Sequence, residues 1–274
     1  MAPDAGSASV AGPLSVTGAA WQSALGILRS QVIYWRPGRQ RALRALYRPH
    51  VPPRGLVFDV GAHLGDRTRA FADLGARVIA LEPQPGVYRW LQRRVGSSSG
   101  VSLRAEAVGP EPGLATLAIS RRFPTLSTLS GSWKSEIGQR NPTFRHVSWD
   151  EAITVRVVTL DQLIQEYGVP DFCKIDVEGF EAEVLAGLSQ PIPALSFEFV
   201  AGALEIAEQC VRRLALLGVY EFNAIRGERR SYLFSSWHSA ETMLDWLRQE
   251  AEGISSGDIY ARVQKGAGNL NAQA

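Results

Sequence analysis

Short apolar runs alternate with amphipathic segments along most of this chain, and this alternation constrains the fold more than any other feature. The apolar run at 56–60 is followed by a glycine, as a buried parallel strand often is, and the segment from Asp66 to Leu74 has helical spacing. The same order of strand and helix recurs from 77 to 217. Such units with short connections predict an α/β fold built on a doubly wound, mostly parallel sheet with helices on both faces.

The periodicity of each segment gives the expected elements. Strands are predicted at 56–60, 77–81, 101–108, 153–158, 172–177 and 195–200, with an antiparallel or edge strand at 114–119 and short apolar pieces at 220–225 and 231–234. Helices are predicted at 66–74, 86–95, 160–167, 181–188 and 241–250, with one more that ends at 217. Residues 121–150 show no clear period.

Charge and cysteine content exclude some classes of protein. The chain has 29 Lys and Arg against 27 Asp and Glu, a formal net charge of +2, which is no electrostatic footprint for nucleic acid. Cys173 and Cys210 cannot build a disulfide framework and are expected to be small buried hydrophobes. The N-terminus lacks the features of a signal peptide, and polar residues interrupt the apolar run at 21–35. We therefore expect no membrane span and a soluble, cytoplasmic protein.

The first two strands end in residues that suit a nucleoside. After Asp59, the glycines Gly61 and Gly65 allow a tight turn, but their spacing fits neither the GxGxxG fingerprint nor a P-loop. Glu82 ends the second strand about twenty residues later, where a carboxylate can accept hydrogen bonds from both ribose hydroxyls. This pattern predicts a nucleoside site without a phosphate clamp. S-adenosylmethionine fits it, because it has a ribose, no phosphate and a cationic sulfonium; a purely structural turn is the alternative.

A third strand end reads KIDVEG at 174–179. If the strand persists, its alternation puts Asp176 and Glu178 on the same face, and Gly179 allows a sharp turn into the next helix. Two carboxylates so close would raise each other's pKa unless Lys174, a metal or a cationic ligand offsets them. In the simpler alternative, Glu178 only begins the helix and favours its dipole.

Three blocks of the sequence carry a resemblance to a known family. They read FDVGAHLGDRT at 58–68, VIALEPQP at 78–85, and TLD at 159–161 followed by FCKIDVEGFE at 172–181. In order and spacing they resemble the FkbM-type S-adenosylmethionine-dependent methyltransferases, as do the strand around Glu198 and the segment at 256–261. The resemblance implies a class I methyltransferase (Rossmann-like) fold and methyl transfer, usually to a hydroxyl oxygen of a sugar, a glycolipid or a secondary metabolite.

The resemblance also implies roles for particular residues. Carried over by position, the cofactor-binding residues are Asp59, Gly61 and Gly65 at the methionine end, His63 in the same turn, Glu82 and Pro83 at the ribose, and Glu106 and Ala107 near the adenine. Asp176 and Glu178 would face the transferred methyl group or the acceptor. Many relatives have Asn where His63 stands, so His63 is either a new polar contact or only a substituted residue of the cofactor turn.

Transfer to a hydroxyl needs a base to remove its proton, and a positioned base adds about 10²–10⁴-fold to the rate. We expect the catalytic residues to be Asp176, Glu178 and His63, and favour the two carboxylates because they belong to the strand-end cluster. His146 and His238 are further candidates, for which a surface or packing role is the alternative. A divalent metal at Asp176 and Glu178 is possible, but without a third nearby ligand in sequence none is predicted.

Two other classes of protein compete with this interpretation. A nicotinamide-dependent oxidoreductase would need a GxGxxG turn and a Tyr-x-x-x-Lys pair, and both are absent from the sequence. A non-catalytic nucleoside- or partner-binding module on the same fold stays open as the alternative. The expected partner is a small-molecule or glycan acceptor, and no nucleic acid.

The chain is expected to divide into four parts. Residues 1–18 and 266–274 are predicted as flexible tails and 19–51 as a helical N-terminal extension. Residues 52–265 are predicted as the methyltransferase domain, with 121–150 as an irregular lid or acceptor loop, since long irregular stretches in compact domains are usually functional or disordered.

Overall fold

The computed structural model describes residues 38–120, 123 and 126–264. The tails predicted at 1–18 and 266–274, and most of the extension predicted at 19–51, lie outside the described residues. A helix of that extension, α2 (Arg39–Tyr47), is described and packs on the main sheet through Leu43 and Tyr47. Among the described residues no helix is long and apolar enough to span a membrane; the apolar run at 21–35 is not among them.

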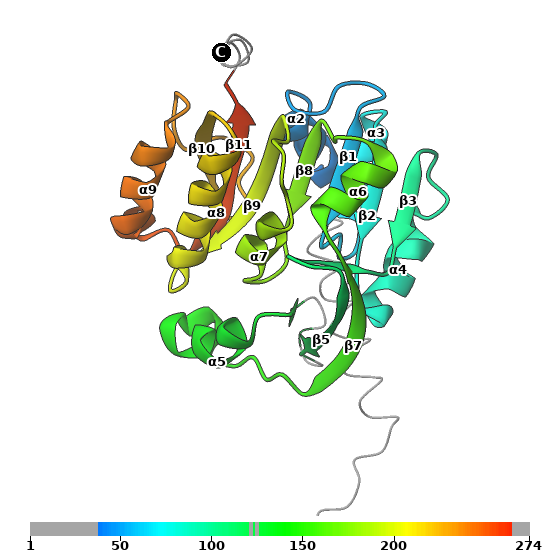
Figure 1. Ribbon diagram of the computed structural model, residues 1–274, viewed down its shortest axis with the longest axis horizontal. Helices are drawn as coiled ribbons and strands as arrows, with labels where there is room; N and C mark the ends of the chain where they lie inside the picture. The colour runs from blue at the N-terminus through cyan, green and yellow to red at the C-terminus, as the bar shows by residue number, and fades with distance from the viewer. Residues whose placement is uncertain (1–37, 121–122, 124–125, 265–274) are drawn as a thin grey trace, which may run out of the picture.

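Seven strands form the main sheet, in the order β10-β11-β9-β8-β1-β2-β3 (Figure 1). Neighbouring strands from β3 to β9 are parallel, whereas β11 runs antiparallel to both β9 and β10. The predicted doubly wound, mostly parallel sheet is therefore confirmed. The bounds are β1 Leu56–Val60, β2 Arg77–Leu81, β3 Val101–Arg104, β8 Phe172–Ile175, β9 Ala194–Val200, β10 Tyr220–Arg226 and β11 Ser256–Val263.

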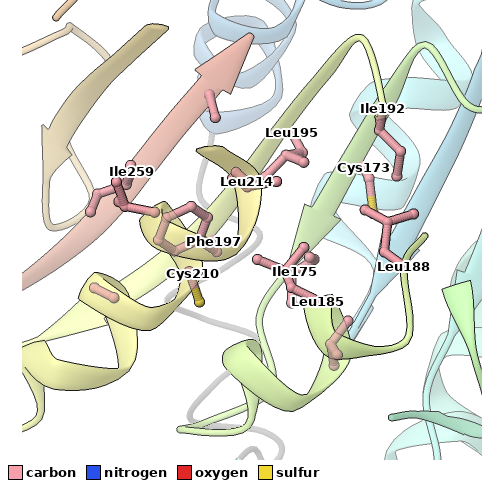
Figure 2. Close-up of a cluster of buried hydrophobic side chains, with 14 of the residues drawn as sticks. Cys173, Ile175, Leu185, Leu188, Ile192, Leu195, Phe197, Cys210, Leu214 and Ile259 are labelled. Atoms are coloured by element: carbon pink, nitrogen blue, oxygen red, sulfur yellow. The ribbon is translucent and has the colours of Figure 1, made fainter. Parts of the chain in front are cut away.

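Helices cover both faces of this sheet, because successive strand residues point to opposite sides. Val57 packs into a core with α2, α3 and α4, whereas its neighbour Phe58 packs into a core with α6, α7, α8 and α9. Figure 2 shows part of the second core, in which Cys173 and Cys210 are buried and free, as predicted. The bounds are α3 Asp66–Asp73, α4 Pro85–Val95, α6 Leu160–Tyr167, α7 Glu181–Ala186, α8 Leu204–Leu217 and α9 Ala240–Arg248.

A smaller sheet of four strands has the order β4-β7-β5-β6. Its long strands β5 (Gly113–Ile119) and β7 (Glu151–Val158) pair antiparallel, so the antiparallel strand predicted at 114–119 is confirmed. The single strand predicted at 101–108 is wrong, because β3 ends at Arg104 and β4 (Ala107–Val108) pairs with β7 in this second sheet. The fourth strand, β6 (Ser127–Thr128), pairs with β5.

The prediction that 121–150 is irregular throughout is wrong at its centre. Residues Gly131–Arg140 form the helix α5. Ser130 caps its N-terminus, because the Ser130 hydroxyl accepts a hydrogen bond from Trp133 N–H. A 3₁₀ turn follows at Pro142–Phe144. Only Trp133 and Ile137 of α5 are buried. The sequence of this helix therefore shows only a weak apolar periodicity. Figure 1 shows α5 and the β5–β7 pair together below the main sheet.

Two further expectations need correction. The piece predicted at 231–234 forms no strand; Asn223 of β10 holds it as a loop by donating hydrogen bonds to the carbonyl oxygens of Phe234 and Ser236. The strand predicted at 172–177 ends at Ile175, and a turn at 176–180 follows it.

Candidate active site

The carboxyl ends of three neighbouring strands, β8, β1 and β2, meet at one edge of the main sheet. The residue after each of two strands extends the pairing by one step: Gly61 N–H donates to Leu81 O (3.0 Å), and Asp176 N–H donates to Val60 O (3.0 Å). Ligands of open α/β sheets bind at this edge, and residues far apart in sequence come together there.

Gly61 is required by the close approach of two strand ends. Its φ is +78°, in the left-handed region that favours glycine, and a Cβ on it would lie 1.8 Å from the carbonyl oxygen of Asp176. The turn after β1 and the turn after β8 are therefore in direct contact, with no room for a side chain between them.

A cleft lies against these strand ends, and we call it the Glu82 cleft. Its other lining residues are mostly apolar and include Leu117, Leu129 and Phe180. Apolar walls with a few polar groups are typical of small-molecule sites. The predicted site residues that line it are Gly61, His63, Glu82, Pro83, Glu106, Ala107 and Asp176.

The carboxylate of Glu82 is fixed by two backbone donors. One oxygen accepts the N–H of His63 (3.1 Å) and the other accepts the N–H of Gln84 (2.9 Å). His63 offers its N–H from a left-handed conformation with φ +48°. Burial raises the pKa of Glu82, although the nearby His63 and the two N–H groups oppose this shift. The carboxylate is thus held in one orientation, with acceptor capacity left for a ligand.

Glu106 is already paired in the structure. Its two carboxylate oxygens accept hydrogen bonds from Arg104 (2.8 and 2.9 Å), and this pair lowers the pKa of Glu106. The pair spans the turn between β3 and β4, which brings Ala107 to the Glu82 cleft.

Asp59 and Gly65, which were also predicted as cofactor contacts, do not line the cleft. The carboxylate of Asp59 is buried and accepts a hydrogen bond from Thr68 Oγ1 of α3 (2.5 Å), and burial raises its pKa to about 6. Gly65 precedes α3 and packs against Leu91 of α4. Asp59 and Gly65 therefore contact α3 and α4 rather than the cleft. Their roles as cofactor contacts stay predictions.

A second cavity of about 100 Å³ adjoins the first, and we call it the Glu178 pocket. His63 and Asp176 line both the cleft and this pocket, so the two are neighbours. All three predicted catalytic residues, His63, Asp176 and Glu178, lie together here. The remaining charged residues that line the pocket are Arg67, Glu198, Glu228 and Asp258.

Lys174 compensates part of this negative charge from inside the sheet. Its side chain is fully buried, and Nζ lies 2.9 Å from Asp258 and 3.4 Å from Asp176. Burial alone would lower the pKa of Lys174, but the two carboxylates raise it. Burial would likewise raise the pKa of Asp176, but Lys174 and Arg67 hold it below its usual range. Lys174 and Asp176 therefore both stay charged at neutral pH.

The backbone conformation that places Glu178 in the pocket differs from the predicted one. Because β8 ends at Ile175, the turn rather than strand alternation brings Asp176 and Glu178 together, and Glu178 itself has a φ of +53°. Burial raises the pKa of Glu178 and of Glu198, and the carboxylate of Asp176 adds to both shifts. Oxygen atoms of Asp176, Glu178 and Glu198 lie within 4.8 Å of one another.

Glu181 holds this turn from the first residue of α7. Its Oε1 accepts the N–H groups of Val177 (3.1 Å) and Gly179 (3.3 Å), and burial raises the pKa of Glu181 to about 7. The short turn is thus fixed at both ends, by the sheet before it and by Glu181 after it.

Sequence reasoning did not assign Arg67, Glu198, Glu228 and Asp258 to the site. Glu198 and Asp258 stand in segments that resemble the family, but the chain alone does not reveal that β9 and β11 follow β8 in the sheet. Neither His146 nor His238 lines the cleft or the pocket. His146 is exposed, and His238 packs edge-on against Phe234 with ring centroids 4.6 Å apart.

A family model matches more than half of this chain. Residues 59–250 match the model of the methyltransferase FkbM domain. The chain is 26% identical over 166 residues to the hexuronic acid methyltransferase AglP of Haloferax volcanii, a match that covers 60% of this chain and 62% of that protein. The matched part thus spans less than two thirds of that relative.

Solved structures of low sequence identity also match. The precorrin-6y C5,15-methyltransferase of Geobacter metallireducens is 11% identical, with a TM-score of 0.44 over 82% of this chain and 87% of that one. Fibrillarin of Aeropyrum pernix, solved with S-adenosyl-L-methionine, is 13% identical, with a TM-score of 0.41 over 81% of this chain and 76% of that one.

Proposed function

Because the chain belongs to the family of the methyltransferase FkbM domain, we propose that it transfers the methyl group of S-adenosylmethionine to a hydroxyl oxygen of a sugar-type acceptor. The name of its relative, a hexuronic acid methyltransferase, supports sugar acids as the first acceptors to test. Glycolipids and secondary metabolites with free hydroxyls are the wider class.

The observation that carries this proposal is the fixed carboxylate of Glu82. A buried acceptor at the end of the second parallel strand suits the two ribose hydroxyls of the donor. The apolar residues of the Glu82 cleft suit the adenine, and Pro83 and Ala107 belong to that part of the proposal. The sulfonium end would then lie toward His63 and Asp176, where a negative charge favours a cation.

The acceptor would occupy the Glu178 pocket, in line with the methyl group across the boundary that His63 and Asp176 share. Its oxygen attacks the methyl carbon, the oxygen–carbon bond forms as the sulfur–carbon bond breaks, and S-adenosylhomocysteine leaves. Holding the two reactants as a near-attack pair supplies on the order of 7–11 kcal/mol at best.

The proton of the hydroxyl must pass to a base, and we assign this role to His63. Asp176 is a poor base because Lys174 and Arg67 hold its pKa low. Imidazole is the side chain best suited to accept a proton near neutral pH, and His63 lines both the cleft and the pocket. Asp176 and Glu178 would then orient the acceptor.

Isothermal titration of the purified protein tests the donor site. We expect micromolar binding of S-adenosylmethionine and none of NADH. Glu82→Ala should weaken this binding by about 1–3 kcal/mol through the lost hydrogen bonds. Glu241→Ala, an exposed carboxylate on α9, is the matched control and should leave it unchanged. No binding by a folded protein would favour a non-catalytic module instead.

Transfer of a labelled methyl group tests the acceptor. Oligosaccharides with hexuronic acids are incubated with methyl-labelled S-adenosylmethionine, and the product is cleaved to locate the label on oxygen. Label on the sugar supports the proposal, whereas binding of the donor without transfer to any sugar would move the search to other hydroxyl compounds.

A further inference from the structure

Three carboxylates converge in the Glu178 pocket without matching positive charge. Asp176 and Glu178 come from the turn after β8, and Glu198 comes from the neighbouring strand β9. Their oxygen atoms lie within 4.8 Å of one another, close enough for one ion to contact all three. Like charges at this distance repel strongly in a partly buried site. No metal was predicted, because the sequence shows no third ligand near Asp176 and Glu178. The structure brings Glu198 beside them as a third ligand.

Glu178 adds an independent observation. Only 8% of its surface is exposed, and its side chain lines the pocket. Within the described part of the chain, no hydrogen bond or ion pair reaches its carboxylate. Buried carboxylates in proteins are normally paired or bound to a metal. The carboxylate of Glu178 is therefore free to take a ligand from the pocket.

Lys174 and Arg67 lie beside the pocket, but of the three carboxylates only Asp176 is within ion-pair distance of either. Lys174 lies against Asp176 and Asp258. Arg67 faces Asp66 (3.7 Å) and Glu228 (3.8 Å). Asp176 has a cation on one side, whereas among the described residues no cation lies within ion-pair distance of Glu178 or Glu198.

We propose that Asp176, Glu178 and Glu198 bind one divalent cation of the Mg²⁺ type. An all-oxygen set favours a hard cation, which keeps open positions for water or substrate oxygens. Resting on the proposed function, the ion would hold the hydroxyl oxygen of the acceptor beside the methyl group and polarise its O–H bond. The carboxylates would serve as ligands, and His63 would receive the proton.

Binding of Mn²⁺ to the full-length protein, freed of metal with EDTA and dialysed, tests the site. The electron paramagnetic resonance signal of free Mn²⁺ disappears on binding, so a titration gives the number of sites and the affinity. We expect one site of micromolar affinity for which Mg²⁺ competes. Glu178→Gln and Glu198→Gln keep the side-chain shape and should each weaken Mn²⁺ binding at least tenfold.

Glu228→Gln is the matched control, because Glu228 lines the same pocket but pairs with Arg39 (3.0 Å) and Arg230 (2.7 Å). It should change the affinity for Mn²⁺ less than threefold. Equal weakening by all three variants would mean diffuse attraction by negative charge and would overturn the site. No Mn²⁺ bound to the wild type at millimolar concentration would also overturn it.

Thermal unfolding gives a second readout that does not depend on activity. Mg²⁺ should raise the Tm of the wild type but not of Glu198→Gln, because a ligand stabilises only the state that binds it. Titration of S-adenosylmethionine in EDTA keeps the two proposals separate. Donor binding without Mn²⁺ binding overturns the metal site alone, and Mn²⁺ binding without donor binding overturns the methyl transfer alone.

Discussion

The indole ring of Trp133 lies directly on the backbone of Gly179. A Cβ on Gly179 would be 2.3 Å from two carbons of that ring, and the φ of Gly179 is +84°. Trp133 belongs to α5, within the segment predicted as a lid or acceptor loop, and Gly179 belongs to the turn that carries Glu178. This contact joins the segment around α5 to the Glu178 pocket.

Gly179→Ala should therefore displace Trp133 and the helix that carries it. We expect a loss of about 1–3 kcal/mol in the free energy of unfolding, from the strained φ and the overlap with the ring. The KM for the acceptor should rise, with the affinity for S-adenosylmethionine changed less than threefold. Gly131→Ala at the start of α5, where a Cβ meets no atom within 4 Å, is the control and should be close to neutral.

Lys174→Met should be strongly destabilising. It would leave the carboxylates of Asp176 and Asp258 without their buried cation, and breaking a buried pair costs about 3–5 kcal/mol. Urea unfolding measures the effect. Adding Asp258→Asn to the variant should restore part of the loss, because it removes one of the charges left unpaired; a double variant as unstable as the sum of the single ones would contradict this coupling.

His63→Asn should separate binding from turnover. Asn accepts a left-handed backbone, so its N–H can still donate to Glu82, and the donor affinity should stay within threefold. Turnover at neutral pH should fall about 10²-fold with the loss of the base. The measurement is kcat with saturating donor, beside titration of the donor. Full activity in this variant would return the role of base to a carboxylate.

Glu181 should make the protein less stable as the pH rises from about 5 to 7. Its pKa is about 7 in the folded protein against an ordinary 4.5, so the folded state binds more protons than the unfolded state in this window. The free energy of unfolding then falls with rising pH by at most about 1.4 kcal/mol per pH unit from this group.

Urea unfolding at several pH values, compared with Glu181→Gln, checks this sign. The variant should lose stability less steeply between pH 5 and 7, because its amide does not titrate. Glu183→Gln, two residues later on α7, should behave as the wild type. Parallel curves for Glu181→Gln and the wild type would show that another group sets the slope.

The main sheet could be predicted because its central strands are continuous apolar runs that end at glycine or acidic residues. The match over residues 59–250 confirms the family and, with it, the expected class of methyltransferases. The strand β11 was not predicted, because Gly257 and Asp258 have low strand propensity and the strand is inserted antiparallel between two others. The helix α5 was missed because it buries only two residues.

The candidate site was predicted to the extent that its residues follow parallel strands along the chain. Glu82 and Asp176 were expected at one edge of the sheet, and the structure places both in the Glu82 cleft. Glu198 and Asp258 lie on strands whose order in the sheet differs from their order in the chain. Which strands lie side by side depends on the order of the strands in the sheet. The periodicity of single segments does not give that order.

The position of Asp258 also determines when the site can form during synthesis. Its strand β11 leaves the ribosome after β9 and β10, yet must enter between them to bring Asp258 to Lys174. Until then, β9 lacks a neighbour on one side and Lys174 lacks the nearer of its two carboxylate partners. The nascent chain therefore completes its sheet and its pocket in one late step, and a chain cut before Ser256 should be cleared by proteases rather than persist as a weak enzyme.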